Sequence, residues 1–464
     1  MKETKIVTDR NGVQYELTAL LGRGGQGAVY AVKGGRLAVK LVEGKGAADL
    51  ERMRNQLMHV RRLPLSDLAL AKPLEMLRPP ATGYLMEMLS DMGPIKSLMV
   101  PPKGQSPSAG WYASGGGLRR RLLLLGRAAH ILSLLHGKGL AYADPSPANI
   151  FISADCDAHE VRFIDTDNLR YHSDPLDGRR GVFTPGYGAP ELVQGKSGVT
   201  SLTDIHALAV IAFQVLTLVH PFVGDLVNDG EPELEEQAFS GLLPWIEDPA
   251  DDRNRASFGI PRPLVLSPRL LDLFNRAFCE GRTNPAVRPG AAEWAERLYG
   301  AADLTVTCPS CCNTFYSKTL RCPWCDAAPS SYAVGVFALW NPALGESGGL
   351  STVPGVAKNK VLFVNQLAIT DGSTVRITRR LAFGQTDDRA DDPVMEICVR
   401  GSRAQVRSLD GKAYRMTAPG AKQTSKVGDI PRTLSLDEKR SSWVIHFGAK
   451  DSLHRVVSFI LRKG

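Results

Sequence analysis

The segments GLAYADPSPANIFI (residues 139–152) and VRFIDTDNL (residues 161–169) carry the pattern that decides the fold. In the first, Asp144 and Asn149 stand five residues apart, just before an apolar strand. A carboxylate can accept the proton of a hydroxyl group or orient it for attack, and an amide oxygen can ligate Mg²⁺ beside it. In the second, Asp165 follows a buried strand, where its carboxylate can bridge Mg²⁺ to phosphates. Together the segments predict a phosphate-handling centre.

A glycine-rich stretch lies upstream, in LGRGGQGAVY (residues 21–30). Gly22, Gly24 and Gly27 have G-x-G-x-x-G spacing, and Val29 follows two residues after the last glycine. Glycines let the backbone approach phosphates closely and present its N–H groups to them. Dinucleotide-binding units and ordinary turns share this spacing. Here a strand rather than a helix is expected to follow, which argues against the dinucleotide alternative.

The next strand ends in LAVK and carries Lys40, whose ammonium group can neutralise phosphate charge. A buried Lys requires an acidic partner to hold it in position. The helix predicted over residues 47–62 offers Asp49 and Glu51. We favour Glu51, because Asp49 suits the start of the helix as a cap. The alternative for Glu51 is an ordinary surface charge pair.

Two further motifs complete the series, namely LMEM (residues 85–88) in a buried strand and TPGYGAPE (residues 184–191). Taken in order with the motifs above, they resemble the eukaryotic-type Ser/Thr protein kinase family, over roughly residues 14–300. The resemblance implies a two-lobed α+β kinase fold that binds ATP and Mg²⁺. It also implies transfer of the γ-phosphate to Ser or Thr hydroxyls of a protein substrate, in intracellular signalling.

The resemblance assigns roles to individual residues in the predicted centre. Lys40 would contact the ATP phosphates, and Asp144 would be the catalytic base. Asn149 and Asp165 would hold Mg²⁺. Asp204, at the start of an apolar helix, would anchor the catalytic loop, because a buried charge requires a partner.

The resemblance also implies where adenine binds and how the activation segment ends. Met86 would be the gatekeeper, and the backbone of Glu87 and Met88 would meet the adenine ring. Glu191, which closes TPGYGAPE, would be buried against Arg288 of the later NPAVRPG motif. This last pair would have a structural role.

The sequence departs from the family's pattern at three places, where Tyr142-Ala143-Asp144 stands for His-Arg-Asp, Ser146 for a Lys, and Asp165-Thr166-Asp167 for Asp-Phe-Gly. Ala143 replaces the Arg that usually docks an activation-loop phosphate, so we expect activity that is independent of phosphorylation at Ser173 or Thr184. Ser146 replaces a Lys that stabilises the transition state, and Asp167, interpreted as a turn cap, replaces the Gly of the metal-binding loop. A pseudokinase scaffold without efficient phosphoryl transfer is therefore an alternative, as is a small-molecule phosphotransferase. We favour the active protein kinase, because every metal and phosphate ligand is present.

Four cysteines form two C-x-x-C units, Cys308-Pro-Ser-Cys311 and Cys322-Pro-Trp-Cys325. Two thiolates on each tight turn can complete a tetrahedral Zn²⁺ site, and with no open position the site would be structural. The alternatives are a redox pair or an adventitious iron site. Cys312 is a spare thiol beside the first unit.

Three parts are expected along the chain, namely a kinase domain over residues 12–301, a zinc module over 303–328 and a β-rich domain over 330–464. The kinase N-lobe would span about 12–88 and the C-lobe about 89–301. Ser97–Gly117 is rich in Pro, Gly and Ser and predicts a flexible insertion. Helices are expected over 118–136, 203–219, 266–279 and 290–300. The last domain would be a β-sandwich or small barrel. Its strands are expected over 331–340, 360–370, 373–384, 395–401, 404–411, 443–448 and 454–462.

Composition and charge indicate the class of protein and where it is expected to be located. With 43% hydrophobic and 22% charged residues the chain is globular rather than disordered. Of the net charge of +8, most falls from Asp326 onward, where there are 20 Lys and Arg and 13 Asp and Glu, yet nucleic-acid binding is the less favoured explanation. We expect no secretory signal, no membrane span and a cytoplasmic protein. The DPSPAN and DTDN variants resemble a bacterial kinase subgroup associated with a von Willebrand A-type protein and a metal-dependent Ser/Thr phosphatase, which are possible partners.

Overall fold

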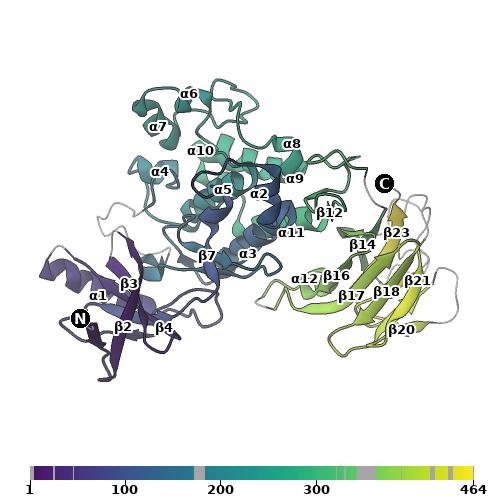
Figure 1. The fold of residues 1–464 in the computed structure, drawn as a ribbon, viewed down its shortest axis with the longest axis horizontal. Coiled ribbons are helices and arrows are strands. Elements are labelled where there is room, and N and C mark those ends of the chain that lie inside the picture. Colours follow the sequence, from purple (N-terminus) through teal and green to yellow (C-terminus); the bar gives the residue numbers. More distant parts are fainter. Residues whose placement is uncertain are drawn as a thin grey trace. The chain divides into compact units, whose positions relative to one another are not determined.

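A computed structural model describes residues 5–24, 27–44, 46–171, 183–319, 321–328, 331–341, 362–387, 389–418, 424–436 and 443–462. The chain forms two compact units (Figure 1). The first comprises Met1–Ser106, Leu124–Arg262 and Pro268–Glu296, and the second comprises Pro107–Leu123, Pro263–Ser267 and Arg297–Gly464. No helix in the described ranges is both long and apolar enough to cross a membrane.

The first unit begins with an antiparallel six-stranded sheet in the order β1-β2-β3-β4-β6-β5. Its strands are β1 (Lys5–Thr8), β2 (Gln14–Gly24), β3 (Gly27–Val32), β4 (Leu37–Val42), β5 (Glu75–Met76) and β6 (Gly83–Glu87). One helix, α1 (Ala47–Arg62), follows β4. The apolar side chains that face inward, among them Val39 and Leu85, form one buried cluster.

Two glycines let the strands on either side of β4 approach its backbone. Gly27 has φ +145°, and a Cβ atom there would lie 2.0 Å from the carbonyl oxygen of Leu41. Gly83 has φ +151°, and a Cβ atom there would lie 2.0 Å from the carbonyl oxygen of Lys40. Neither position tolerates a side chain without backbone movement. Gly27 is therefore required by strand packing, independently of any ligand.

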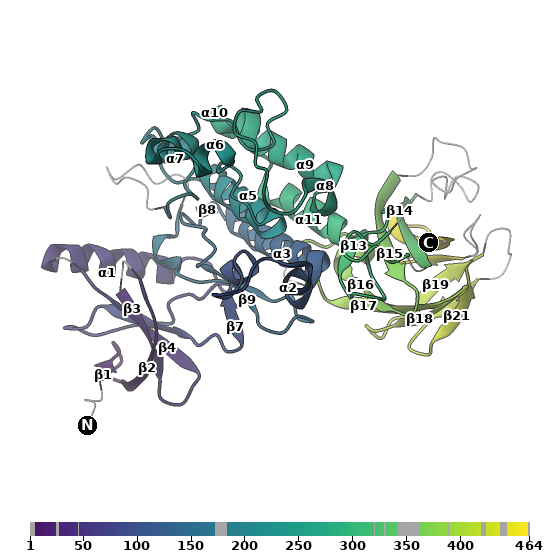
Figure 2. The same ribbon diagram turned by 45° about the horizontal axis from the view of Figure 1, so that its top comes forward.

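Helices dominate the rest of the first unit, and Figure 2 shows them from a second direction. The helices that lie wholly or partly in it are α3 (Gly117–Gly137), α4 (Pro190–Val193), α5 (Ser201–Thr217), α6 (Asp225–Asn228), α7 (Pro232–Phe239), α8 (Arg262–Val265), α9 (Pro268–Asn275), α10 (Gly281–Thr283) and α11 (Ala291–Asp303). A π-helical turn (Arg276–Glu280) links α9 to α10, and 3₁₀ turns occur at Ile95–Leu98, Thr166–Asn168 and Pro285–Val287. Short strands are β7 (Met92–Pro94), β8 (Leu140–Ala141), β9 (Ile150–Ser153), β10 (Val161–Phe163) and β11 (Arg170–Tyr171).

The buried helix expected over residues 203–219 is confirmed as α5. Thr200 and Thr203 form a reciprocal capping box at its N-terminus, in which each side chain bonds the other residue's backbone. Nearly all of its side chains are buried. This rigid, capped helix carries Asp204 in its first turn.

The second unit contains a β-sandwich, which confirms the expected β-rich region. One sheet has the order β15-β14-β23-β22-β19-β20 and the other β16-β17-β18-β21, and inward side chains from both form one apolar cluster. The strands are β14 (Tyr332–Trp340), β15 (Leu362–Thr370), β16 (Thr374–Thr378), β17 (Pro393–Arg400), β18 (Arg403–Ser408), β19 (Tyr414–Thr417), β20 (Ser425–Val427), β21 (Arg432–Ser435), β22 (Val444–His446) and β23 (His454–Arg462). A short hairpin of β12 (Thr305–Thr307) and β13 (Thr314–Tyr316) precedes them.

Two local expectations were wrong. Residues 379–383 form a helix, α12 (Arg379–Phe383), rather than continuing the strand before them. Within Ser97–Gly117, which was expected to be a flexible insertion, α2 (Ala109–Ser114) forms instead, with Ser108 as its N-cap. Its Tyr112 is buried and stacks on Trp324 with ring centroids 5.1 Å apart. Aromatic burial overrides the Gly- and Ser-rich composition of this segment.

Candidate active site

Lys40 lies at the centre of a buried group of charges. On β4, its Nζ donates hydrogen bonds to Asp165 Oδ1 and, over 2.6 Å, to Asp167 Oδ2. Burial opposes the charged form of the Lys40 ammonium, but the carboxylates of Asp167 and Asp165 overcome this effect and raise its pKa. Tyr84 lies opposite Lys40 in the β4–β6 register and donates to Asp167 Oδ1 over 2.6 Å. Lys40 is therefore a cation held between two carboxylates.

The two carboxylates differ in exposure because of how their turn is built. Asp165 follows β10 with φ 55°, in the left-handed region, and its side chain is 32% exposed. The 3₁₀ turn Thr166–Asn168 then directs Asp167 inward, where its side chain is only 8% exposed. Thr166 anchors the turn, because its buried hydroxyl donates to the carbonyl of Ala71 over 3.2 Å. One carboxylate thus remains accessible to a ligand while the other is enclosed.

Asp144 lies in the loop before β9 and contacts the start of the TPGYGAPE segment. Its Oδ1 accepts hydrogen bonds from the backbone N–H and the hydroxyl of Thr184, at 2.8 and 2.9 Å. Burial raises the pKa of the Asp144 carboxyl, although these two bonds act in the opposite direction. Asn149 donates from Nδ2 to the backbone carbonyl of Asp144 over 3.1 Å. This bond commits the amide nitrogen and leaves the amide oxygen for a cation.

Asp204 holds this loop from below, which confirms the role expected for it. Its carboxylate accepts from the backbone N–H groups of Tyr142 and Ala143, at 2.6 and 2.9 Å, and lies 3.0 Å from Nε2 of His136. These bonds fix Ala143 at φ 86°. The hydroxyl of Tyr142 donates to the carbonyl of Ile164, the residue before Asp165. The loop of Asp144 and the turn of Asp165 are thereby joined directly.

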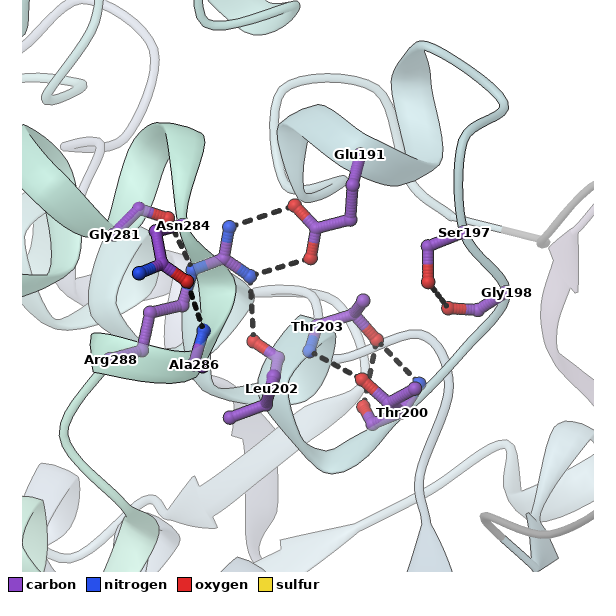
Figure 3. Close-up of polar contacts among 10 residues, drawn as sticks. All are labelled: Glu191, Ser197, Gly198, Thr200, Leu202, Thr203, Gly281, Asn284, Ala286 and Arg288. Atoms are coloured by element: carbon purple, nitrogen blue, oxygen red, sulfur yellow. Dashed lines mark hydrogen bonds and ion pairs between the residues drawn. The ribbon is translucent and has the colours of Figure 1, made fainter.

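The end of the TPGYGAPE segment is fixed by a buried ion pair (Figure 3). Arg288 binds Glu191 through both carboxylate oxygens, with Nη1–Oε1 and Nη2–Oε2 distances of 2.7 and 2.8 Å. The Arg288 guanidinium also donates to the carbonyls of Leu202 and Gly281, at 3.0 and 2.8 Å. Its side chain is fully buried. The Glu191–Arg288 pairing expected from the sequence is confirmed.

Comparison with known families agrees with this geometry. The family model for the protein kinase domain matches residues 15–299, more than half of the chain. This chain belongs to the protein kinase family.

Curated relatives place the chain with the eukaryotic-type Ser/Thr kinases. It is 30% identical over 234 residues to the DNA damage-responsive serine/threonine-protein kinase RqkA of Deinococcus radiodurans, covering 46% of this chain and 31% of that protein. It is 27% identical over 231 residues to the serine/threonine-protein kinase PknB of Mycobacterium leprae, covering 46% of this chain and 34% of that protein. The chain thus spans about a third of the length of these relatives.

Within this kinase domain, the strand residues assigned to nucleotide binding neighbour Lys40. Val29 pairs with Lys40 in the β3–β4 register, and Met86 and Glu87 lie farther along β6, opposite the start of β4. Met88 follows β6 and donates its N–H to the carbonyl of Arg36 over 3.1 Å. Gly22 and Gly24 end β2 in open space, with no heavy atom within 4 Å of a Cβ atom built there. Their roles toward a nucleotide remain predictions.

The partner of Lys40 differs from the one that we favoured. Glu51 is exposed on α1, whereas Lys40 pairs with Asp165 and Asp167. Our interpretation of Asp167 as a turn cap missed its contact with Lys40. The sequence feature that could have indicated this contact is Asp167 itself, an acid two residues after Asp165 where the family has Gly. Ser173, the other residue considered for phosphorylation, lies outside the described residues.

The four cysteines of the second unit converge. The sulfur atoms of Cys308, Cys311, Cys322 and Cys325 all lie within 4.8 Å of one another. The Cys308–Cys325 and Cys311–Cys322 sulfur distances are both 3.7 Å. A Zn²⁺ tetrahedron with Zn–S bonds near 2.3 Å requires sulfur separations of about 3.8 Å. The geometry fits a structural zinc site, with all four positions taken by protein.

The two C-x-x-C turns have the same backbone form. The N–H of Cys308 donates to Asn313 and that of Cys322 to Ala327, at 2.8 and 3.0 Å. The fifth residue of each turn, Cys312 or Asp326, has a positive φ of 58° or 57°. Cys312 therefore occupies a turn position with an exposed side chain, outside the cluster of four sulfurs.

Loss of one partner from the Glu191–Arg288 pair should be costly. We expect Glu191→Gln to lower the free energy of unfolding by about 3–5 kcal/mol, because it leaves a buried guanidinium without its counter-charge. The matched control is Glu293→Gln, which breaks the half-exposed Arg276–Glu293 pair (2.8 Å) and should cost less than about 1 kcal/mol. Calorimetric unfolding of the full chain measures both, and equal effects would contradict the structural role.

Metal analysis tests the cysteine cluster. We expect freshly purified protein to contain one zinc per chain, and Cys322→Ser to lose it together with the stability of the second unit, because folding and metal binding are coupled. Cys312→Ser should retain the metal, since its thiol lies outside the cluster. Protein that contains no zinc, or iron in its place, would contradict this assignment.

Proposed function

We propose that this chain is an ATP- and Mg²⁺-dependent protein kinase that transfers the γ-phosphate of ATP to Ser or Thr hydroxyls. The observation that carries the proposal is the joining of the Asp144 loop to the Asp165 turn through Tyr142, beside the buried Lys40. A base, a metal-binding carboxylate and a phosphate-binding cation are needed together in phosphoryl transfer. Membership of the Ser/Thr kinase family favours a protein as the substrate.

The donor groups fit the nucleotide and its metal ion. Mg²⁺ prefers oxygen ligands, and Asp165 and Asn149 supply a partly exposed carboxylate and an amide oxygen. When bound, MgATP would supply the phosphoryl group, and its Mg²⁺ would neutralise part of the phosphate charge. In this proposal Lys40 would bind phosphate oxygens, and Gly22, Gly24 and Gly27 would let the backbone approach them.

Asp144 would act on the hydroxyl of the substrate. Its Oδ1 is committed to Thr184, which leaves the other oxygen to orient the hydroxyl and accept its proton. Ser146 is buried at 1% exposure and supplies no cation to the transferring phosphate. Transition-state charge must therefore be offset by Lys40 and the metal ion alone among the groups assigned here, and we expect slow turnover.

Cytoplasmic location and the two protein partners remain predictions. The von Willebrand A-type protein and the metal-dependent Ser/Thr phosphatase are inferred from the resemblance to a bacterial subgroup. Co-purification with this chain from the native host would test both protein partners.

Phosphoryl transfer from radiolabelled ATP tests the activity itself. We expect the wild-type chain with Mg²⁺ to label itself or an added protein on Ser or Thr. Asp144→Asn should lower kcat by about 10²–10⁴-fold, because the base is lost, and Asp165→Asn should lower it to background. Asp157→Asn, which changes an exposed acid in the connection between β9 and β10, is the control. Nucleotide binding without any transfer would instead identify a pseudokinase.

A further inference from the structure

We propose that Asp167 is the residue that positions Lys40, in place of an acidic residue of α1. This inference rests on the proposed function, in which Lys40 binds nucleotide phosphates. Protein kinases generally place their Lys by an ion pair with a Glu from the helix that follows it. In this chain the ion pair is made from the turn after β10, at 2.6 Å.

Both oxygens of Asp167 are engaged, and their contacts fix its orientation. Oδ2 accepts from Lys40 and Oδ1 accepts from the hydroxyl of Tyr84, each at 2.6 Å. Tyr84 is fully buried on β6, directly opposite Lys40. A buried carboxylate with both oxygens bonded holds a single geometry. Asp167 is thus built as a fixed support rather than as a surface turn cap.

Next to the Asp167–Asn168 turn, helix α1 presents side chains that do not bind Lys40. Met53, Gln56 and Leu57 line a cavity of about 320 Å³ between the helix and the Asp167–Asn168 turn. Gln56 donates to the carbonyl of Leu169 over 3.1 Å, so its amide binds the backbone rather than Lys40. Asp49 and Arg52 of α1 also line this cavity, and they pair with each other at 2.9 Å. The helix therefore presents apolar groups, an amide and a charged pair to the cavity, while Lys40 pairs with the two acids after β10.

The backbone explains why position 167 can carry an acid. The residue of the turn that has a positive φ is Asp165, whereas Asp167 lies within a right-handed 3₁₀ turn. A glycine is consequently not required at 167. Asp in place of the family's Gly therefore adds a carboxylate at position 167 without requiring a positive φ.

Asp165 and Asp167 can have different roles because their side chains differ in exposure. Asp165 is partly exposed and can turn toward a metal ion, whereas the enclosed Asp167 keeps its contact with Lys40. Lys40 then retains a counter-charge both with and without a metal ion bound to Asp165, as a buried cation requires. The ion pairs of Lys40 are consequently made without an acidic group from α1.

The affinity for MgADP tests this role without any catalytic step. We expect Asp167→Asn to weaken MgADP binding to the full chain by about tenfold, equal to about 1.4 kcal/mol, and to raise the KM for ATP in parallel. Glu51→Gln should have a smaller effect than Asp167→Asn. Glu16→Gln serves as the matched control, because it removes the carboxylate from an exposed Lys33–Glu16 pair (2.7 Å) of the same sheet.

A comparison of stability with binding separates positioning from a merely structural role. The group contains two carboxylates and one ammonium, so Asp167→Asn leaves Lys40 paired with Asp165. We expect the melting temperature of the nucleotide-free variant to stay at or above that of the wild type while MgADP affinity falls. Tyr84→Phe, which frees Oδ1 of Asp167 but keeps the charge, provides a milder second variant and should weaken MgADP binding about threefold.

Several outcomes would overturn the inference. These are unchanged MgADP affinity in Asp167→Asn, a larger loss in Glu51→Gln, or, should Asp167→Asn fail to fold, unchanged affinity in Tyr84→Phe. A wild-type chain that binds MgADP but transfers no phosphate would refute the proposed function alone. In that case the affinities still decide the role of Asp167.

Discussion

The burial of one ammonium group constrains how strand β4 and its neighbours are arranged in this kinase domain. Lys40 is only 6% exposed, so its charge requires counter-charges from within the fold. Strand β4 places it, and Gly27 and Gly83 allow the neighbouring strands to come close on either side. Because Tyr84 is the register partner of Lys40, its hydroxyl reaches the carboxylate that meets the ammonium. The sheet and the turn after β10 are thus held together by the ion pairs of Lys40 with Asp165 and Asp167.

A second set of contacts makes the catalytic loop part of the same rigid body. Asp204 on α5 binds the backbone of Tyr142 and Ala143, and the hydroxyl of Tyr142 reaches the carbonyl of Ile164. Tyr142 also packs edge-on against Phe163, with ring centroids 5.0 Å apart. Tyr142 is a residue at which the sequence departs from the family, and its contacts with Ile164 and Phe163 hold the loop in place. The loop geometry is therefore maintained without the usual His and Arg.

The features predicted best from the sequence are those that the resemblance to the kinase family implied residue by residue. The role of Asp204 and the Glu191–Arg288 pair could be assigned in this way because their motifs stand in the family's order and a buried charge needs a partner. The partner of Lys40 could not, since acids on α1 and after β10 are equally plausible until the strands are placed in space. The helix at 109–114 escaped composition-based analysis because two aromatic residues, Trp111 and Tyr112, outweigh the flexible residues around them. The short strands β19, β20 and β21 were missed because they have few apolar residues each.

In this chain an acid on a turn, Asp167, pairs with Lys40, whereas most kinases use an acid on a helix. This difference affects how the site can be regulated. In a kinase whose Lys is positioned by a helix, displacement of that helix breaks the ion pair and switches the site off. Here Asp165 directly precedes the 3₁₀ turn Thr166–Asn168 and Asp167 lies within it, and this segment is anchored by Thr166 to Ala71 and by Tyr142 to Ile164. The carboxylate proposed to hold a metal ion and the carboxylate that holds Lys40 are therefore carried by one anchored segment. Because Gln56 of α1 donates to the carbonyl of Leu169, α1 would influence Lys40 through this segment rather than through an acidic group of its own.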